Sequence, residues 1–376
     1  MLRADLDAPH ENGKILDDYR IRMAVPTIKH LLDGGARLVI ISKNGKPKGV
    51  DPHESLDIVW KRLEELLGRR ISFCTKDLTI PANQEEIKKL SEQGSVLLEN
   101  IRFYPAEQKP DLNFAKTLAS LGDIYVNDAF AMMHRDEASV SLVPNFLPAY
   151  AGLNVEKELN GLNAVLKMRA NPFLVMIGGA KISDKVGVVK NLGRDADQIL
   201  VGGGPANLFL AAKGYEIGKS ICEKEQIALA EDLLRNFKSK IILPIDVVVA
   251  DPDNLSTARV SDVDKIKPNE AVYDIGPKTI LEFSKYIKAA KKMIWNGPMG
   301  WFEQKQFSHG TTSIALIYAS RCKGRAYGIT GGGDTVDALD QAKVRDSIDF
   351  VSTAGGATLD YLAGDKLPGL IALENS

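Results

Sequence analysis

Short β-branched runs alternate with amphipathic stretches along the chain, and this alternation most constrains the fold. Runs of this length suit buried strands, whereas the stretches between them repeat apolar residues with helical spacing. Buried strands that alternate with helices are typical of parallel sheets covered by helices on both faces. The sequence therefore predicts an α/β fold.

The predicted strands fall into two groups, which indicates two sheets. We expect strands at 38–41, 71–73, 96–98 and 124–126, and then at 173–177, 199–201, 241–243, 247–249, 293–295, 326–330 and 350–352. Helices are expected at 20–32, 54–67, 84–90, 113–121, 183–192, 205–213, 224–236, 278–288, 312–321, 335–342 and 357–362. This order predicts two doubly wound parallel-sheet (Rossmann-like) domains.

The chain has 376 residues, enough for two domains at about 150 residues each. The join is expected near residues 146–167, where Pro148 precedes a helical stretch. That stretch is either a stiff hinge or an ordinary crossover helix, and spacing alone favours neither. We predict an N-terminal domain at 1–155 and a C-terminal domain at 156–357, with the last segment, about 358–376, packed back on the first domain.

Overall charge and cysteine content argue against several classes of protein. The net charge of −1 gives no global attraction to nucleic acid or to an anionic membrane. Cys74, Cys222 and Cys322 lack CxxC spacing, which argues against a disulfide framework or zinc site and favours a reducing compartment. The chain start lacks a signal-peptide core, and no apolar run approaches the roughly 18 residues of a spanning helix. We expect a cytoplasmic monomer with no nucleic-acid or membrane partner.

Five glycine-rich turns lie in the second half, and most of them follow a predicted strand. Glycine lets backbone N–H groups approach a ligand without a β-carbon in the way, and a helix that starts there adds unpaired N–H donors. Together these turns predict a sheet edge that holds a polyphosphate. They are Gly178-Gly179-Ala180-Lys181, Gly202-Gly203-Gly204-Pro205, Gly297-Pro298-Met299-Gly300, Gly331-Gly332-Gly333-Asp334 and Ala354-Gly355-Gly356-Ala357.

Charged residues follow the predicted strands of the first half. Ligands of an open parallel sheet bind outside the carboxyl ends of its strands, where these residues and the glycine turns both fall. Two such edges facing each other would form a cleft with one basic and one glycine-rich wall. The charged residues are Lys43 and Lys46 after one strand, Glu99 and Arg102 after another, and Asp128, His134 and Arg135 after a third.

Several familiar motifs are incomplete in this chain. Residues 214–220 resemble a P-loop, but three residues separate Gly214 from Gly218 and the loop needs four. His134-Arg135-Asp136 resembles a protein-kinase catalytic loop without its later Asn and without a DFG. No GxGxxG follows a strand, and the histidines lack metal-binding spacing.

Some charged residues allow two interpretations. Lys181 and Lys185 share one face if they lie on a helix, either over a bound phosphate or as ordinary surface lysines. Asp334 follows three glycines and suits either a Mg²⁺ ligand or a helix N-cap. Arg20, Arg102 and Arg135 have the planar fork that binds phosphate and carboxylate, but each is alone in sequence.

Taken in order, these segments resemble the phosphoglycerate kinase family over nearly the whole chain. The matching strings include Glu99-Asn100-Ile101-Arg102-Phe103, Val126-Asn127-Asp128-Ala129-Phe130, Gly178-Gly179-Ala180-Lys181-Ile182-Ser183-Asp184-Lys185, Asp274-Ile275-Gly276-Pro277, Trp295-Asn296-Gly297-Pro298-Met299-Gly300 and Gly331-Gly332-Gly333-Asp334-Thr335. Ordered matches of this length are specific to a family.

The resemblance implies a hinge-bending phosphotransferase with a carboxyl group as acceptor, in which a hinge helix joins the two domains. Such an enzyme moves a phosphoryl group between 1,3-bisphosphoglycerate and Mg-ADP, giving 3-phosphoglycerate and Mg-ATP in glycolysis and gluconeogenesis. Two alternatives are a paralogous kinase with another carboxylate acceptor and a nucleotide-binding protein without turnover.

The resemblance also implies site residues in both domains. Phosphoglycerate ligands are expected at Asp5, Asp7, Arg20, Lys43, Lys46, Arg102, His134 and Arg135. Nucleotide contacts are expected at Gly179, Lys181, Lys185, Gly203, Gly276, Pro298, Glu303, Gly332, Gly333, Asp334 and Thr335, with Asp334 as the Mg²⁺ ligand. Arg20, Lys181, Gly332 and Gly355 are expected to stabilise the transferring group.

The chain departs from the family pattern mainly in the acceptor half. Asp7 stands where the family has Asn, and Lys43 and Lys46 replace its His and Arg. An anionic Asp7 near an anionic substrate is unfavourable unless it is paired or faces a hydroxyl. Smaller departures are Ala131, Ala354 and Trp301, whose ring is suited to stacking on a base. The family's first strand is also largely missing before Arg3, which is expected to weaken an edge of the first sheet.

Overall fold

Two six-stranded sheets organise the chain, and all strand pairs within each sheet are parallel. The structure is a computed structural model that describes residues 1–376 apart from the side chain of Gln93. Chain contacts divide it into one unit of Met1–Asn160 with Lys366–Ser376 and a second of Gly161–Asp365. The junction lies between Asn160 and Gly161, inside helix α6 (Leu153–Lys167), about five residues after the boundary expected between 155 and 156 in the same helix.

The first unit contains a sheet with the strand order β5-β6-β4-β1-β7-β8. Its strands are β1 (Leu2–Arg3), β4 (Val39–Ile41), β5 (Ser72–Cys74), β6 (Val96–Leu98), β7 (Tyr125–Asn127) and β8 (Ala149–Ala151). Its helices are α1 (Tyr19–Asp33), α2 (Asp57–Leu67), α3 (Pro81–Gln93), α4 (Pro105–Gln108), α5 (Leu112–Ala119) and α14 (Pro368–Glu374), and β2 (His10–Glu11) and β3 (Lys14–Ile15) form a hairpin.

Side-chain alternation along the strands explains why helices cover both faces of this sheet. Val39 and Ile41 pack with Phe114 of α5, whereas Ile40 packs on the opposite face with Ile28 of α1. Successive strand residues point to opposite faces, so an apolar run such as Val39–Ile41 is stable only when both faces are buried.

β1 lies in the middle of the first sheet, and the expectation of a weakened edge is therefore wrong. Leu2 pairs with Ile40 of β4 on one side and with Val126 of β7 on the other. The short strand is fully buried between longer neighbours. Its position brings Asp5 and Asp7, which follow it, to the middle of the sheet's carboxyl edge.

The second unit contains the sheet β11-β10-β9-β15-β16-β17. Its strands are β9 (Phe173–Ile177), β10 (Gln198–Val201), β11 (Ile241–Ile242), β15 (Lys292–Asn296), β16 (Tyr327–Thr330) and β17 (Phe350–Val351). Its helices are α7 (Val186–Asp195), α8 (Gly203–Ala212), α9 (Ile227–Phe237), α10 (Pro277–Ala289), α11 (His309–Ala319), α12 (Gly333–Gln341) and α13 (Gly356–Ala363). One face packs through Trp295 against Phe283 and Tyr318 of α10 and α11.

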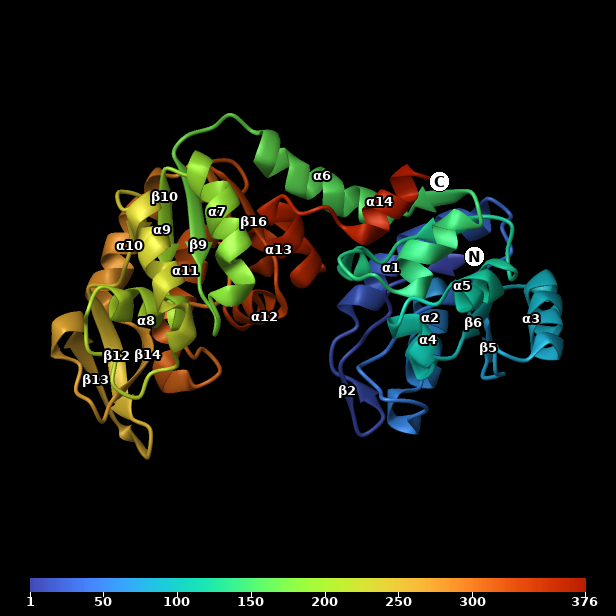
Figure 1. Ribbon diagram of the computed structural model, residues 1–376, viewed down its shortest axis with the longest axis horizontal. Helices are drawn as coiled ribbons and strands as arrows, with labels where there is room; N and C mark the ends of the chain where they lie inside the picture. The colour runs from blue at the N-terminus through green and yellow to red at the C-terminus, as the bar shows by residue number, and fades with distance from the viewer. The chain divides into compact units, whose positions relative to one another are not determined.

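A separate antiparallel sheet, β13-β12-β14, was not predicted. It consists of β12 (Asp246–Asp251), β13 (Asn254–Asp262) and β14 (Ala271–Ile275), beside α8 at one end of the second unit (Figure 1). The sequence analysis assigned 247–249 to a parallel sheet, which is wrong. It missed β13 because that strand is mostly exposed and polar, so no apolar run marks it.

The C-terminal segment divides between the two units. α13 packs against α7 of the second unit, while α14, red in Figure 1, lies among elements of the first unit. There the Gly369 N–H donates to the Met133 carbonyl at 2.9 Å. The returning tail therefore starts at Lys366 and not near residue 358, because the apolar face of α13 is already buried on α7. Among the described residues, no helix is both long and apolar enough to cross a membrane.

A buried polar network fixes the segment that follows β7. Ser139 Oγ accepts from Arg3 Nε at 2.9 Å and donates to Glu107 Oε1 at 2.5 Å, and its N–H donates to Glu107 Oε2 at 2.9 Å. Tyr125 donates to the Ser139 carbonyl at 2.6 Å. Burial raises the pKa of Glu107 to about 7, against the opposing effect of Arg3. The network anchors the chain just after His134 and Arg135.

Replacing Ser139 with Ala is expected to lower the free energy of unfolding by about 2 to 4 kcal/mol, because two buried charged groups each lose a hydrogen bond. Chemical denaturation measures the change. Ser141→Ala, on the same helical turn but partly exposed, is the matched control and is expected to change stability by about 1 kcal/mol or less. Equal effects of the two substitutions would contradict the assigned role of Ser139.

Candidate functional site

The carboxyl edge of the first sheet brings together charged residues from four separate segments. Asp5 and Asp7 follow β1, Lys43 follows β4, Arg102 follows β6, and Arg20 lies in the first turn of α1. Parallel strands end at the same edge, so residues far apart in sequence become neighbours there.

Asp7 is the centre of this cluster. Its carboxylate forms an ion pair with Lys43 Nζ, accepts from the Gly45 N–H at 2.9 Å and accepts from Arg20 Nη1 at 3.1 Å. Arg20 Nη1 also lies 3.7 Å from Asp5 Oδ2. An anionic Asp7 was expected to need a partner, and these contacts supply it. Burial alone would raise the pKa of Asp7, but Lys43, the Gly45 N–H and Arg20 together hold it below its usual value.

Arg102 is buried beside this cluster, with 3% of its surface exposed. Its guanidinium donates from Nη1 to the Gly45 carbonyl at 2.9 Å and from Nη2 to Glu137 Oε1 at 2.8 Å. Its Nε is buried without a hydrogen-bond partner. Arg102 thus holds the turn at Gly45, whose N–H binds Asp7, and has one donor left for another group.

The remaining predicted acceptor residues are more open. Lys46 and Arg135 are exposed, and among the described contacts neither side chain makes a hydrogen bond or ion pair. His134 is half-buried. The structure therefore brings Asp5, Asp7, Arg20, Lys43 and Arg102 into one cluster and leaves Lys46 and Arg135 at the surface.

The glycine turns of the second unit pack against one another. A β-carbon on Gly178 would overlap the Pro298 carbonyl, and one on Gly204 would overlap the Ala180 carbonyl. Gly203 has a φ of +59°, which also excludes most side chains at this contact. These glycines are thus explained by close backbone packing between the ends of β9, β10 and β15.

Two other glycines are open to solvent or ligand. A β-carbon on Gly333 would meet nothing within 4 Å, and one on Gly355 would meet only Gly332 Cα, at 3.5 Å. Gly333 begins α12, and Gly355 is the N-cap of α13. Helix starts of this kind present N–H groups to an anion. Compared with the packed glycines, these two therefore leave more open space at this edge.

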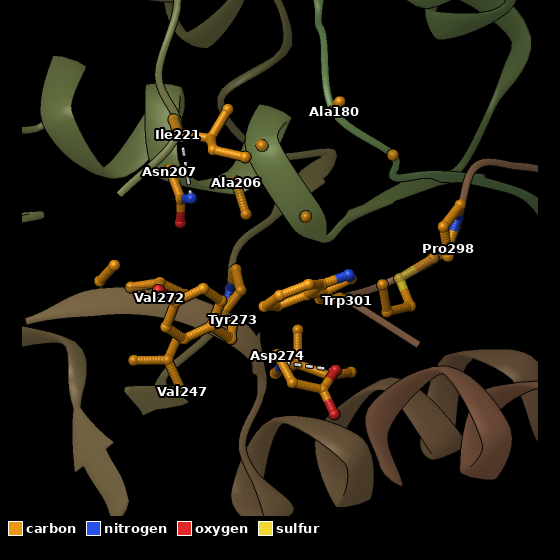
Figure 2. Close-up of a pocket in the computed structure, with 18 of the residues that line it drawn as sticks. Ala180, Ala206, Asn207, Ile221, Val247, Val272, Tyr273, Asp274, Pro298 and Trp301 are labelled. Carbon is orange, nitrogen blue, oxygen red and sulfur yellow. Dashed lines mark hydrogen bonds between the residues drawn. The ribbon is translucent and has the colours of Figure 1, made fainter. Parts of the chain in front are cut away.

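A cavity of about 440 Å³, of a size typical for small-molecule sites, extends to Asp334, the residue after Gly333. Figure 2 shows the Trp301 ring between α8, which carries Ala206 and Asn207, and the strand that carries Val272 and Tyr273. The ring centroids of Trp301 and Tyr273 are 5.5 Å apart. Aromatic rings beside a mostly apolar cavity suit a planar base. Of the predicted nucleotide contacts, Gly179, Gly203, Pro298, Glu303 and Asp334 line the cavity.

The two predicted lysines differ in environment. Lys181 is exposed, whereas Lys185 is buried beside Gly179 and donates to the Lys181 carbonyl at 3.3 Å. Burial lowers the pKa of Lys185, and Asp184 and Asp334 oppose that shift. An anion that entered here would therefore meet a cation with little competition from water.

Asp334 is the predicted metal ligand. Its carboxylate is exposed at the first turn of α12 and lines the cavity. Among the described side chains, no group of at least three His, Cys, Asp or Glu residues is arranged to hold a metal alone. One free carboxylate fits Mg²⁺, which is commonly held by one or two carboxylates, water and substrate phosphates.

Sequence reasoning missed some cavity residues and assigned others that lie elsewhere. Asp274, whose pKa burial raises to about 7, lines the cavity and accepts from the Gly310 N–H at 2.6 Å. It belongs to the Asp274-Ile275-Gly276-Pro277 string, in which only Gly276 was predicted to contact the nucleotide. Gly276 is not among the cavity residues and instead faces Asp246. The Thr335 hydroxyl accepts from the Gly297 N–H at 2.7 Å, so it joins two turns.

Comparison with known proteins shows similarity over the whole chain. Residues 1–365 match the family model described as phosphoglycerate kinase. A phosphoglycerate kinase of Pelotomaculum thermopropionicum is 43% identical over 99% of this chain and 95% of its own length, and one of Chloroflexus aurantiacus is 44% identical over 100% and 96%.

Solved structures agree with the sequence comparison. Phosphoglycerate kinase from Coxiella burnetii aligns with a TM-score of 0.85 and 37% identity, covering 100% of this chain and 95% of that chain. The enzyme from Pyrococcus horikoshii aligns with a TM-score of 0.86 and 31% identity, covering 99% and 95%. The predicted two-domain α/β fold is confirmed by these matches.

Gly204→Ala is expected to lower the free energy of unfolding by about 2 to 3 kcal/mol, because the new methyl group overlaps the Ala180 carbonyl. Gly333→Ala is the matched control for packing and is expected to change stability by about 0.5 kcal/mol or less. Gly333→Ala is also expected to weaken the binding of Mg-ADP, which calorimetry measures. Equal stability losses would contradict the division between packing and open glycines.

Asp7→Asn tests the ion pair through its pH dependence. The folded-state pKa of Asp7 lies below the usual 3.8, so its contribution to stability is present above that pH and is lost as the pH falls through the folded value. The variant is expected to be less stable than the unmodified chain by about 1 to 3 kcal/mol at pH 7, with the gap narrowing below about pH 4.

An exposed pair supplies the control for this measurement. Asp33 lies 2.6 Å from Arg69, and both side chains are more than half exposed. Asp33→Asn is expected to change stability by about 1 kcal/mol or less. A pH-independent loss in Asp7→Asn would show that its charge is not what stabilises the fold.

Proposed function

Because the chain belongs to the phosphoglycerate kinase family, we propose that it moves a phosphoryl group reversibly between 1,3-bisphosphoglycerate and Mg-ADP, forming 3-phosphoglycerate and Mg-ATP. In this proposal the first unit binds the phosphoglycerate and the second binds the nucleotide. The full-length family match favours neither the paralogue with another acceptor nor the binding protein without turnover.

The observation that carries the nucleotide half of the proposal is the edge of the second sheet. A base-sized cavity with Tyr273 and Trp301 in its wall extends to Asp334, in the first turn of α12. The base would lie against the rings, and the phosphates would extend towards the N–H groups at Gly333 and Gly355. Exposed Glu303, also in the cavity wall, is placed to accept from a ribose hydroxyl.

The acceptor half rests on the cluster around Asp7. Arg20, Lys43 and Arg102 supply positive charge for the phosphate and carboxylate of phosphoglycerate, and we assign the exposed cations Lys46 and Arg135 to the same substrate. We assign Asp7 to the substrate hydroxyl, from which it would accept, since a carboxylate only accepts. We assign the half-buried His134 to the same substrate.

The chemistry asks these residues mainly for positioning and charge stabilisation. In the direction of ATP use, an oxygen of the 3-phosphoglycerate carboxylate bonds to the γ-phosphorus while the bond from that phosphorus to the ADP oxygen breaks. No general base is needed, because the carboxylate already carries the attacking electron pair. Arg20 and Lys181 would neutralise the phosphoryl group, and the N–H groups around Gly332 and Gly355 would donate to it.

Mg²⁺ fits this proposal through Asp334, the exposed carboxylate beside the cavity. When bound with the nucleotide, it would neutralise charge on the phosphate oxygens. Water must be excluded during transfer, because the acyl phosphate product hydrolyses. Lobe closure and a hinge at α6 remain part of the proposal, as do a monomeric state and a cytoplasmic location. The buried free thiols of Cys74 and Cys322 support a reducing compartment.

Arg20→Ala is expected to lower kcat by about a hundredfold to a thousandfold in a coupled assay with 3-phosphoglycerate and Mg-ATP. The reason is that the variant lacks the positive charge that would stabilise the transferring phosphoryl group. Binding of Mg-ADP is expected to stay unchanged. Arg22→Ala is the control, since Arg22 lies on the same helix but pairs with Asp18 at 2.9 Å. If the unmodified chain binds ADP but shows no turnover, the proposed function is wrong.

A further inference from the structure

We propose that Glu223 is a positioning residue for phosphoryl transfer, because it fixes the loop that carries Lys181 and Lys185 and ties that loop to the base cavity. We call residues 180–185 the lysine loop and residues 219–223 the strap. The kinetic part of this inference rests on the proposed function, whereas the link between cavity and loop can be tested without turnover.

Glu223 reaches the lysine loop with both carboxylate oxygens. Oε2 accepts from the Ile182 N–H at 2.7 Å and from the Ser183 N–H at 3.1 Å, and Oε1 accepts from the Ser183 hydroxyl at 2.6 Å. Hydrogen bonds to a charged acceptor are stronger than neutral ones. A single side chain from a distant segment thus holds two successive peptide groups of the loop.

The other side of the lysine loop is held by one of its own side chains. Lys185 Nζ donates to the Lys181 carbonyl at 3.3 Å, and its ammonium group lies beside Gly179. The peptide group that joins Lys181 and Ile182 is therefore held from both sides. The Lys185 ammonium binds its carbonyl, and the Glu223 carboxylate binds its N–H. Loss of Glu223 would release one of these two supports.

Glu223 also decides which N–H groups remain for a phosphate. Those of Ile182 and Ser183 precede α7 and point at the Glu223 carboxylate, which would repel a second anion at the same place. The N–H groups at the start of the 3-10 turn Ser183–Lys185, which leads into α7, are thereby taken up by positioning, and phosphate is directed to the open turns at Gly333 and Gly355.

The strap connects this anchor with the base cavity. Lys219 and Ile221 line the cavity, and the Ile221 carbonyl accepts from Asn207 Nδ2 at 3.1 Å, the bond drawn in Figure 2. Ser220 Oγ accepts from the Val272 N–H at 2.8 Å. The strap is thus fixed to α8 and β14, and its last residue is Glu223. A base in the cavity would therefore restrain the lysine loop through the strap.

Glu223→Ala is expected to lower kcat about tenfold to a hundredfold, because a catalytic group displaced by about 1 Å loses most of its effect. The Kd for Mg-ADP is expected to change less than about threefold, since Tyr273 and Trp301 in the cavity wall make none of the described contacts with Glu223 and stay in place. Glu223→Gln keeps one acceptor oxygen, and its kcat is expected to lie between those of the unmodified chain and Glu223→Ala. The matched control is Glu225→Ala, an exposed carboxylate two residues along the chain.

Ser183→Ala removes one of the three bonds and completes a double-mutant cycle. If Glu223 acts through this loop, adding Ser183→Ala to Glu223→Ala changes kcat no further. Additive losses, an unchanged kcat in Glu223→Ala, or the same loss in Glu225→Ala would each overturn the assignment. A loss of thermal stability with kcat per folded molecule unchanged would show a merely structural role and would also overturn it.

Amide hydrogen exchange tests the link to the cavity independently of turnover. Adenosine, which carries no phosphate, is expected to slow exchange at Ile182 and Ser183 in the unmodified chain and not in Glu223→Ala. Identical exchange in the two proteins would overturn the inference. If the unmodified chain shows no turnover but adenosine still protects these amides through Glu223, the proposed function fails while the coupling stands.

Discussion

Backbone-to-backbone contact between glycine turns is the constraint on which the second unit depends. β9, β10 and β15 lie next to one another in the sheet, so the turns that follow them meet at its carboxyl edge. Any side chain at Gly178 or Gly204 would push these strand ends apart. These glycines close the centre of the edge, and the outer turns at Gly333 and Gly355 stay open for an anion. The cavity then lies between the closed turns, α8 and β14.

The sequence predicted the fold well wherever burial produces apolar runs. The strand Phe173–Ile177 is buried at every position, so its run of apolar residues was easy to read, and the predicted bounds agree with β9. β13 is a nine-residue strand with mostly exposed side chains, and nothing in its local pattern separates it from a loop. β1 is short and was read as missing, because only its pairing with β4 and β7 makes it a strand.

The site was predictable in part, for a related reason. Residue type and position after a strand pointed to Lys43, Arg102 and the glycine turns, since the topology of a parallel sheet gathers such residues at one edge. Pairing could not be predicted, because the contact of Asp7 with Lys43, Arg20 and the Gly45 N–H joins three distant segments. For the same reason the contact of Glu223 with the lysine loop could not be predicted, because that loop lies about 40 residues earlier in the chain.

The ion pair between Asp7 and Lys43 makes these two positions genetically interdependent. A change at codon 7 alone leaves the Lys43 ammonium without this counter-ion, and a change at codon 43 alone leaves the Asp7 carboxylate with only Arg20 and the Gly45 N–H as partners. Each single change therefore upsets the local charge balance, whereas exchange of both residues for neutral ones keeps it. Substitution at one of these positions is thus more readily accepted when the other changes with it.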